Sequence, residues 1–188
     1  MDKVRGRHVS IQTMQTEAGG GHRNCEFPVI DPKLTGQRHD EVVCACDTRQ
    51  GVQGTTQGLI KLAFPREGEK EGRGGLRTIG YYDPGPRRFC GEPCLIPKSR
   101  SRSGSGSEEG TSSFWVIASV HDAATLKADV VILDGDDLSS GPVATLHLPH
   151  ALPMSLHGAW SEQFLGPEDE DAAAANDFFR STRVLAVI

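Results

Sequence analysis

Short runs of apolar residues, each followed by a polar or glycine-containing segment, recur through the middle of the chain. Five such runs stand out, and they occupy residues 42–46, 59–64, 114–120, 130–133 and 142–148. They are rich in β-branched and aromatic residues and too short for helices, which predicts β-strands. The third and fourth runs flank a polar segment, residues 121–129, so we expect this pair to form a hairpin.

The last run shows how side chains divide between the two faces of a strand. Ala144, Leu146 and Leu148 alternate with Thr145 and His147, so the two sets lie on opposite faces. Prolines that follow residue 148 end the strand. Many short strands and almost no helical periodicity predict an all-β fold, built as a sheet repeat, a sandwich or a propeller.

Two stretches interrupt this pattern. Residues 98–113 are rich in Ser, Arg and Gly, and their position between two predicted strands indicates a solvated loop insertion. Residues 166–188 form an acidic and Ala-rich tail. In that tail Pro167 and the acids after it precede Arg180 and Arg183, an order that suits the dipole of a short helix.

Composition narrows the classes of protein. Apolar residues make up 37% of the 188, and the 22 Gly bring the share to that of an ordinary globular domain, so we do not expect disorder throughout. The net charge of −5 disfavours nucleic acid as a partner. The longest apolar run, residues 114–120, is far shorter than a transmembrane helix, and the start of the chain does not predict a signal peptide.

The cysteines favour reduced thiols. There are five of them, an odd number in a chain for which no secretory signal is predicted. The spacings from Cys44 to Cys46 and from Cys90 to Cys94 do not match the C-x₂-C pairs of structural zinc sites. Buried free Cys side chains that behave as small apolar residues are the interpretation we prefer.

Three of the seven histidines, His147, His150 and His157, lie close together in the sequence. The predicted geometry argues against one metal site made from all three, because His147 is on the polar face and two prolines redirect the chain before His157. His157 is distinctive for its apolar flanks and for the glycine that follows it. Taken alone, that setting is more typical of a core histidine than of a metal ligand.

Two carboxylates, Glu26 and Glu92, are embedded in apolar residues, and each has a proline close behind it. Burial of a carboxylate costs several kcal/mol unless hydrogen bonds or a charge compensate it. From the residues alone, the simpler interpretation is that both point to solvent from edge positions. The functional alternative is that they accept the ring N–H of a metal-bound histidine, which fixes its tautomer.

Four segments together resemble the carotenoid cleavage oxygenases, the retinal pigment epithelial membrane protein family. Residues 91–97 resemble the family's GEP-x-hydrophobic-hydrophobic-P segment, and residues 26–32 resemble its EFP segment. Residues 129–134 with 141–149 resemble the last strands, and residues 153–160 resemble the closing P-x-G-F-H-G motif. The four matches occur in the family's order over about residues 22–165, which is a far more specific signal than any one of them.

The resemblance implies a fold and a chemistry. The fold would be the C-terminal blades of a seven-bladed β-propeller, incomplete in this chain, over residues 22–165. The cofactor would be a non-haem Fe(II) held by four histidines, with glutamates that orient most of them. The reaction would be O₂-dependent cleavage of a conjugated double bond in a carotenoid or apocarotenoid to give two carbonyl products, or isomerisation of a retinoid.

Residue by residue, the resemblance makes His157 the last iron ligand and makes Glu26 and Glu92 the carboxylates behind the ligands, with Glu92 the better partner for His157. No residue of the chain is given a catalytic role. We expect the chain to correspond to the last third of such an enzyme, as a shortened gene product or a piece that pairs with another chain, with the other three ligands outside it. The expected compartment is plastid or cytoplasm, and peripheral membrane contact of the full-length protein stays open.

Three hypotheses follow, in this order. The first is a carotenoid oxygenase whose C-terminal part is this sequence. The second is a non-enzymatic remnant or interaction module of the same fold. The third is a small zinc protein that uses Cys44, Cys46, Cys90 or Cys94 with histidine.

Overall fold

Two antiparallel β-sheets form the core of the computed structural model, which describes residues 23–48, 54–64, 76–98, 113–154, 156–161 and the short strand 186–187. The first sheet has the order β1-β2-β3-β4, so each strand pairs with the next one along the chain. Its strands are β1 (Cys25–Val29), β2 (Glu41–Cys46), β3 (Gly58–Ala63) and β4 (Arg77–Tyr82). A 3₁₀ turn, η1 (Pro32–Leu34), follows β1.

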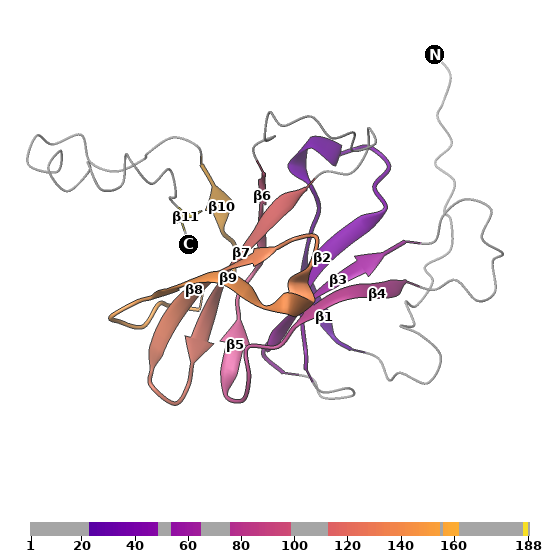
Figure 1. Cartoon of the computed structure of the whole chain (residues 1–188). Coiled ribbons are helices and arrows are strands. Elements are labelled where there is room, and N and C mark those ends of the chain that lie inside the picture. Colours follow the sequence, from indigo (N-terminus) through magenta and orange to yellow (C-terminus); the bar gives the residue numbers. More distant parts are fainter. Residues whose placement is uncertain are drawn as a thin grey trace, which may run out of the picture.

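The second sheet repeats this arrangement, except that its first position is divided between two short strands. Both β5 (Arg88–Cys90) and β6 (Cys94–Pro97) pair with β7 (Phe114–Asp122), which is followed by β8 (Lys127–Asp134) and β9 (Pro142–His147). The 3₁₀ turn η2 (Leu138–Ser140) joins β8 to β9. Figure 1 shows the two sheets side by side, with the small pair β10 (Ala159–Trp160) and β11 (Ala186–Val187) near β6.

The five strands expected from the apolar runs are present as β2, β3, β7, β8 and β9. The hairpin is longer than its apolar residues indicated. Pairing continues through His121 with Ala128 and Asp122 with Lys127, so the turn is shorter than the polar segment. The centre of the 98–113 insertion and the helix expected in the tail lie outside the described residues.

The sheets pack face to face because each presents an apolar face. The cluster between them takes buried side chains from both sheets: Val43, Ala45, Leu59, Tyr82, Cys90, Leu95, Phe114, Val116, Ala118, Val120, Val131, Leu133 and Leu138. On the other face of the first sheet, a second cluster contains Val42, Cys44, Cys46, Ile60, Leu62 and Leu76. Alternation along β2 and β3 supplies both clusters, and for this reason these two strands carry apolar side chains on both faces.

Polar contacts also join the two sheets. The Thr56 hydroxyl donates to the carbonyl of Cys90 at 2.8 Å. The Lys61 ammonium, on a buried side chain of β3, donates to the carbonyl of Gly135 at 2.9 Å and pairs with Glu41 at 2.7 Å. These contacts compensate buried polar groups and fix how the sheets lie against each other.

None of the helices among the described residues is long and apolar enough to cross a membrane.

Candidate metal-ligand site at His157

The segment between β5 and β6 projects one carboxylate out of the second sheet. Cys90 pairs with Val120 and Cys94 with Ile117, so the register shifts by one residue across the intervening segment. Gly91 stays against β7, where its N–H donates to the carbonyl of Ser119 at 2.9 Å and a Cβ would collide with the Ser119 hydroxyl. The next proline is fully buried. This bulge explains why glycine and proline stand on either side of Glu92.

Glu92 makes two contacts with the segment around His157. Its Oε2 accepts the backbone N–H of Gly158 at 2.7 Å, and its Oε1 lies 3.2 Å from Nδ1 of His157. The Glu92 side chain is only 17% exposed, whereas that of His157 is 79% exposed. The interpretation that Glu92 points to solvent is therefore wrong, because two N–H groups compensate its burial.

Phe27 reaches the same histidine from the first sheet. Its ring meets that of His157 edge to face, with centroids 6.0 Å apart and planes at 88°. Phe27 has a φ of 53° and lies where the register of β1 against β2 shifts between Glu26 and Val29. The bulge turns the ring from the regular alternation of the strand toward His157, while the ring also packs against the cluster between the sheets.

These contacts determine which nitrogen of His157 can bind a metal. A carboxylate only accepts hydrogen bonds, so Nδ1 carries the proton that lies between His157 and Glu92. In the neutral ring, the lone pair is then on Nε2, the nitrogen away from Glu92. A histidine ligand supported by a carboxylate has this arrangement, so the residues fit one imidazole ligand of a metal centre.

The expectation of a core histidine is wrong for His157. Its neighbours Met154 and Leu156 are 54% and 71% exposed. Prolines at positions 149 and 153 keep this segment irregular, so its apolar side chains do not enter the cluster between the sheets. The ring is held by Glu92 and Phe27 at a surface, where its free edge can meet a ligand.

Comparison with known proteins gives the family. The family described as Retinal pigment epithelial membrane protein matches residues 6–162, most of the chain. The chain belongs to this family.

Curated relatives are oxygenases and dioxygenases by name. The apocarotenoid-15,15'-oxygenase of Synechocystis is 28% identical over 140 residues, 74% of this chain and 25% of the relative. The resveratrol cleavage oxygenase 1 of Chaetomium globosum is 38% identical over 94 residues, 50% of this chain and 14% of the relative. A chloroplastic 9-cis-epoxycarotenoid dioxygenase of Oryza sativa subsp. japonica is 31% identical over 170 residues, 87% of this chain and 23% of the relative. The chain thus spans about a quarter or less of the length of these relatives.

Solved structures confirm the fold class. A structure of the Synechocystis apocarotenoid oxygenase matches 75% of this chain and 26% of its own, with a TM-score of 0.54 and 28% identity. A cobalt-substituted form of that enzyme matches equally well. The two sheets of this chain are blades of an incomplete all-β propeller, as expected.

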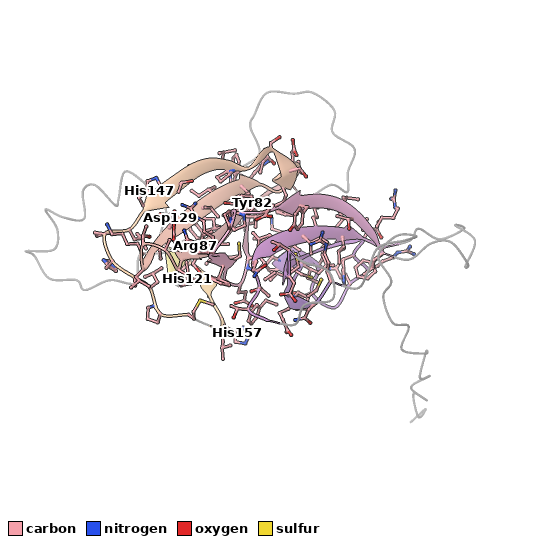
Figure 2. All side chains as sticks on the ribbon, turned by 90° about the horizontal axis from the view of Figure 1, so that it is seen from below. Tyr82, Arg87, His121, Asp129, His147 and His157 are labelled. Atoms are coloured by element: carbon pink, nitrogen blue, oxygen red, sulfur yellow. The ribbon has the colours of Figure 1, made fainter. Side chains whose placement is uncertain are left out.

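The other candidate residues lie apart from His157. Figure 2 shows His147 beside Asp129 and well separated from His157, and Nδ1 of His147 lies 2.8 Å from Asp129 Oδ1. Glu26 is exposed on β1, and it makes no hydrogen bond to a histidine among the described residues. Within those ranges, no group of three or more His, Cys, Asp or Glu side chains is placed to hold a metal ion. The roles of His157, Glu92 and Glu26 toward a metal remain predictions.

The five cysteines are free thiols in the structure. Burial raises the pKa of Cys44 and Cys46 to about 12 and raises the pKa of Cys90 still further. These thiols hold their protons at neutral pH, which disfavours the thiolate form that binds zinc.

Phe27 was not predicted to be part of the site. The EFP segment marked its neighbour Glu26, but a positive φ at a phenylalanine cannot be inferred from one sequence. The role of Gly91 could have been inferred, since a glycine within a run of strand-forming residues indicates a bulge or a close backbone contact.

Proposed function

We propose that the chain is the part of a non-haem iron oxygenase that supplies one imidazole ligand, His157, and the carboxylate that orients it, Glu92. The reaction is cleavage of a conjugated carbon–carbon double bond of a carotenoid or apocarotenoid with O₂, which gives two carbonyl products. Family membership and the names of the relatives support this chemistry. The observation that carries the proposal is the double contact of Glu92 with Nδ1 of His157 and the N–H of Gly158.

The donor atom suits iron. Neutral imidazole is a common ligand for Fe(II), and in the neutral ring the contact to Glu92 places the lone pair on Nε2 of His157. When bound, Fe(II) would supply O₂ activation at positions that protein ligands leave open. The cobalt-substituted structure of the Synechocystis enzyme supports a metal site in the family.

Each residue of the chain then has a positioning task. Glu92 keeps the proton on Nδ1 of His157 and fixes the backbone at Gly158. Phe27 limits rotation of the ring by edge contact. Glu26 lies next to Phe27 on the same strand, and we assign it the corresponding support of a histidine from the rest of the enzyme.

The position of the site also agrees with a propeller. Phe27 comes from the first strand of the first sheet, and Glu92 comes from the divided first strand of the second sheet. The sheets of a propeller surround a central channel, where donors from several blades can meet one metal ion. One ligand from each of several blades is therefore the expected donor set.

The test uses the native polypeptide that contains this sequence, supplied with Fe(II) and an apocarotenal in air. Mass spectrometry should find two carbonyl fragments, and His157→Ala should lower their formation at least ~100-fold, as for a group that acts with the metal. His147→Ala is the matched control, since its side chain is equally exposed and also lies beside a carboxylate. Equal product from all three proteins would overturn the proposal.

A second substrate class has its own support. The relative named resveratrol cleavage oxygenase 1 is 38% identical to this chain over its aligned region, more than the apocarotenoid-15,15'-oxygenase or the 9-cis-epoxycarotenoid dioxygenase. Stilbenes also contain a conjugated double bond that can be cleaved to two carbonyl products. The same preparation incubated with a hydroxylated stilbene would give two aromatic aldehydes if this class is the substrate.

A further inference from the structure

Two cysteines lie directly opposite each other on the edge of the first sheet. Cys25 of β1 faces Cys46 of β2 in an antiparallel pair. The neighbouring pair is hydrogen-bonded, since the N–H of Asp47 donates to the carbonyl of Asn24 at 3.0 Å. Hydrogen-bonded and non-hydrogen-bonded pairs alternate along such a ladder, so Cys25 and Cys46 form a non-hydrogen-bonded pair.

This kind of pair brings side chains closest together. Its Cα atoms are about 4.5 Å apart, which lies within the range of about 4.4–6.8 Å that a disulfide spans. We propose that Cys25 and Cys46 form a redox-modified pair, which an oxidant converts to a cross-strand disulfide without a change of the β1–β2 register. This inference does not depend on the proposed function.

The two thiols differ in access. Cys46 is fully buried, whereas Cys25 is partly exposed and packs at the border of the same apolar cluster. Burial raises the pKa of Cys25, and the charge of Arg23 opposes that rise. Cys25 is therefore the thiol that meets an oxidant first, and oxidation becomes faster as the pH rises.

The step is balanced with hydrogen peroxide as the oxidant. The Cys25 thiol loses its proton and the thiolate attacks one peroxide oxygen; the O–O bond breaks, and the leaving hydroxide takes up that proton, so a sulfenic acid and water are formed. The sulfur of Cys46 then attacks the sulfur of Cys25 and releases a second water. Two thiols and one peroxide thus give one disulfide and two waters.

No other thiol has this relation to Cys25. Cys44 lies on the same strand as Cys46, but the shift in register places the bulge of β1 beside it. Cys94 belongs to the second sheet, where it faces Ile117. The ladder therefore selects one partner for Cys25.

The disulfide would restrain β1, the strand that carries Phe27. β1 is the edge of its sheet, and Cys25 precedes Phe27 by two residues. A disulfide at Cys25 would hold the edge strand to β2 just before the bulge that aims this ring at His157. Proteolysis within β1 should slow by about 10-fold or more in the oxidised chain.

The experiment treats the chain with hydrogen peroxide, blocks remaining thiols and maps the unreduced peptides by mass spectrometry. The peptide pair joined through Cys25 and Cys46 should exceed any other pair at least ~10-fold, since only these two lie opposite each other. Cys25→Ser should remove it. Cys94→Ser, at a thiol that is also partly exposed, should leave it unchanged.

A second arm oxidises the chain in denaturant, where the preference for the Cys25–Cys46 pair should disappear. The proposal is overturned if the folded chain keeps both thiols free, if its five cysteines pair without preference, or if the preference persists in denaturant.

Discussion

At the scale of single residues, the ability of His157 to bind a metal through Nε2 depends on the hydrogen bond that its Nδ1 makes. Nδ1 lies 3.2 Å from Glu92, and the second oxygen of that carboxylate accepts the N–H of Gly158. Both oxygens of Glu92 are thus acceptors for one short segment. In our proposal, this arrangement leaves Nε2 of His157 as the donor to the metal.

Glu92→Gln tests this assignment. An amide has one acceptor atom, so it cannot accept from both Gly158 and Nδ1, and the imidazole should move its proton to Nε2. Nitrogen NMR of the metal-free chain should show that change of tautomer. In the native polypeptide, Fe(II) affinity should fall about 10–100-fold. An unchanged tautomer with unchanged affinity would contradict the role of Glu92.

Glu92 and His157 are recognisable in the sequence from the order of the motifs, not from their physical setting. Alone, His157 suggested a core position and Glu92 an edge position exposed to solvent, and the structure shows the reverse for both. The reason is that exposure here depends on a contact between residues 65 positions apart. Local hydrophobicity carries no information about such a contact.

At the scale of elements, the bulge between β5 and β6 places the carboxylate. Gly91 lies so close to β7 that a Cβ would collide with the Ser119 hydroxyl. The bulge therefore depends on a glycine at this position and on a small side chain opposite it.

Gly91→Ala should destabilise the chain by about 1–3 kcal/mol, the usual cost of overpacking a buried position. Ser119→Ala removes the hydroxyl that the new methyl would meet, so the double variant should recover much of that loss. Urea unfolding of the unmodified chain, the two single variants and the double variant measures the coupling free energy between the two positions. Strictly additive losses would show that the contact between residues 91 and 119 is not the cause.

The raised pKa values of the two β2 thiols predict how the stability of the chain depends on pH. The pKa of both Cys44 and Cys46 is about 12 in the folded chain, against an ordinary 9.0. Between these values the unfolded chain loses thiol protons that the folded chain keeps. The contribution of these thiols to stability should therefore be constant below about pH 8 and fall above pH 9, by up to ~1.4 kcal/mol per pH unit for each thiol.

Urea midpoints measured from neutral to alkaline pH test this effect. In the Cys44→Ala/Cys46→Ala variant, the alkaline loss should be smaller than in the unmodified chain. An identical loss in both would assign it to other groups.

The strands found from sequence are those with continuous apolar runs. β2 and β3 are buried on both faces, and β7 supplies the centre of its sheet. β4 and β5 were not predicted. The first three residues of β4 are exposed, and β5 is only three residues long. Short or half-exposed strands are determined by their partners, so a single sequence shows them poorly.

At the scale of the whole molecule, two blades are joined by apolar packing and by few polar contacts. Among the described residues, Lys61 is the buried cation, and it connects β3 to the turn after β8 through the carbonyl of Gly135. Its ammonium also pairs with Glu41 and lies over the ring of Phe114.

Lys61→Met keeps the length of the side chain but leaves the Gly135 carbonyl and the Glu41 carboxylate without this donor. The expected loss is about 1–3 kcal/mol, the cost of an unsatisfied buried group. Lys33→Met, at an exposed lysine on η1, should change stability by less than about 0.5 kcal/mol. Thermal unfolding compares the two, and equal effects would contradict a specific role for Lys61.

The relatives are about three times as long as this chain, so the metal centre that we propose would draw its other donors from the rest of the enzyme. In our proposal the described residues contribute one donor, and that donor is His157.

The most direct measurement is the iron content of the native polypeptide after anaerobic loading with Fe(II) and removal of unbound metal. We predict near-stoichiometric iron in the unmodified protein and in His147→Ala, and a loss of about 10-fold or more in His157→Ala. Iron content that is the same in His157→Ala and His147→Ala, with both proteins folded, would contradict the account.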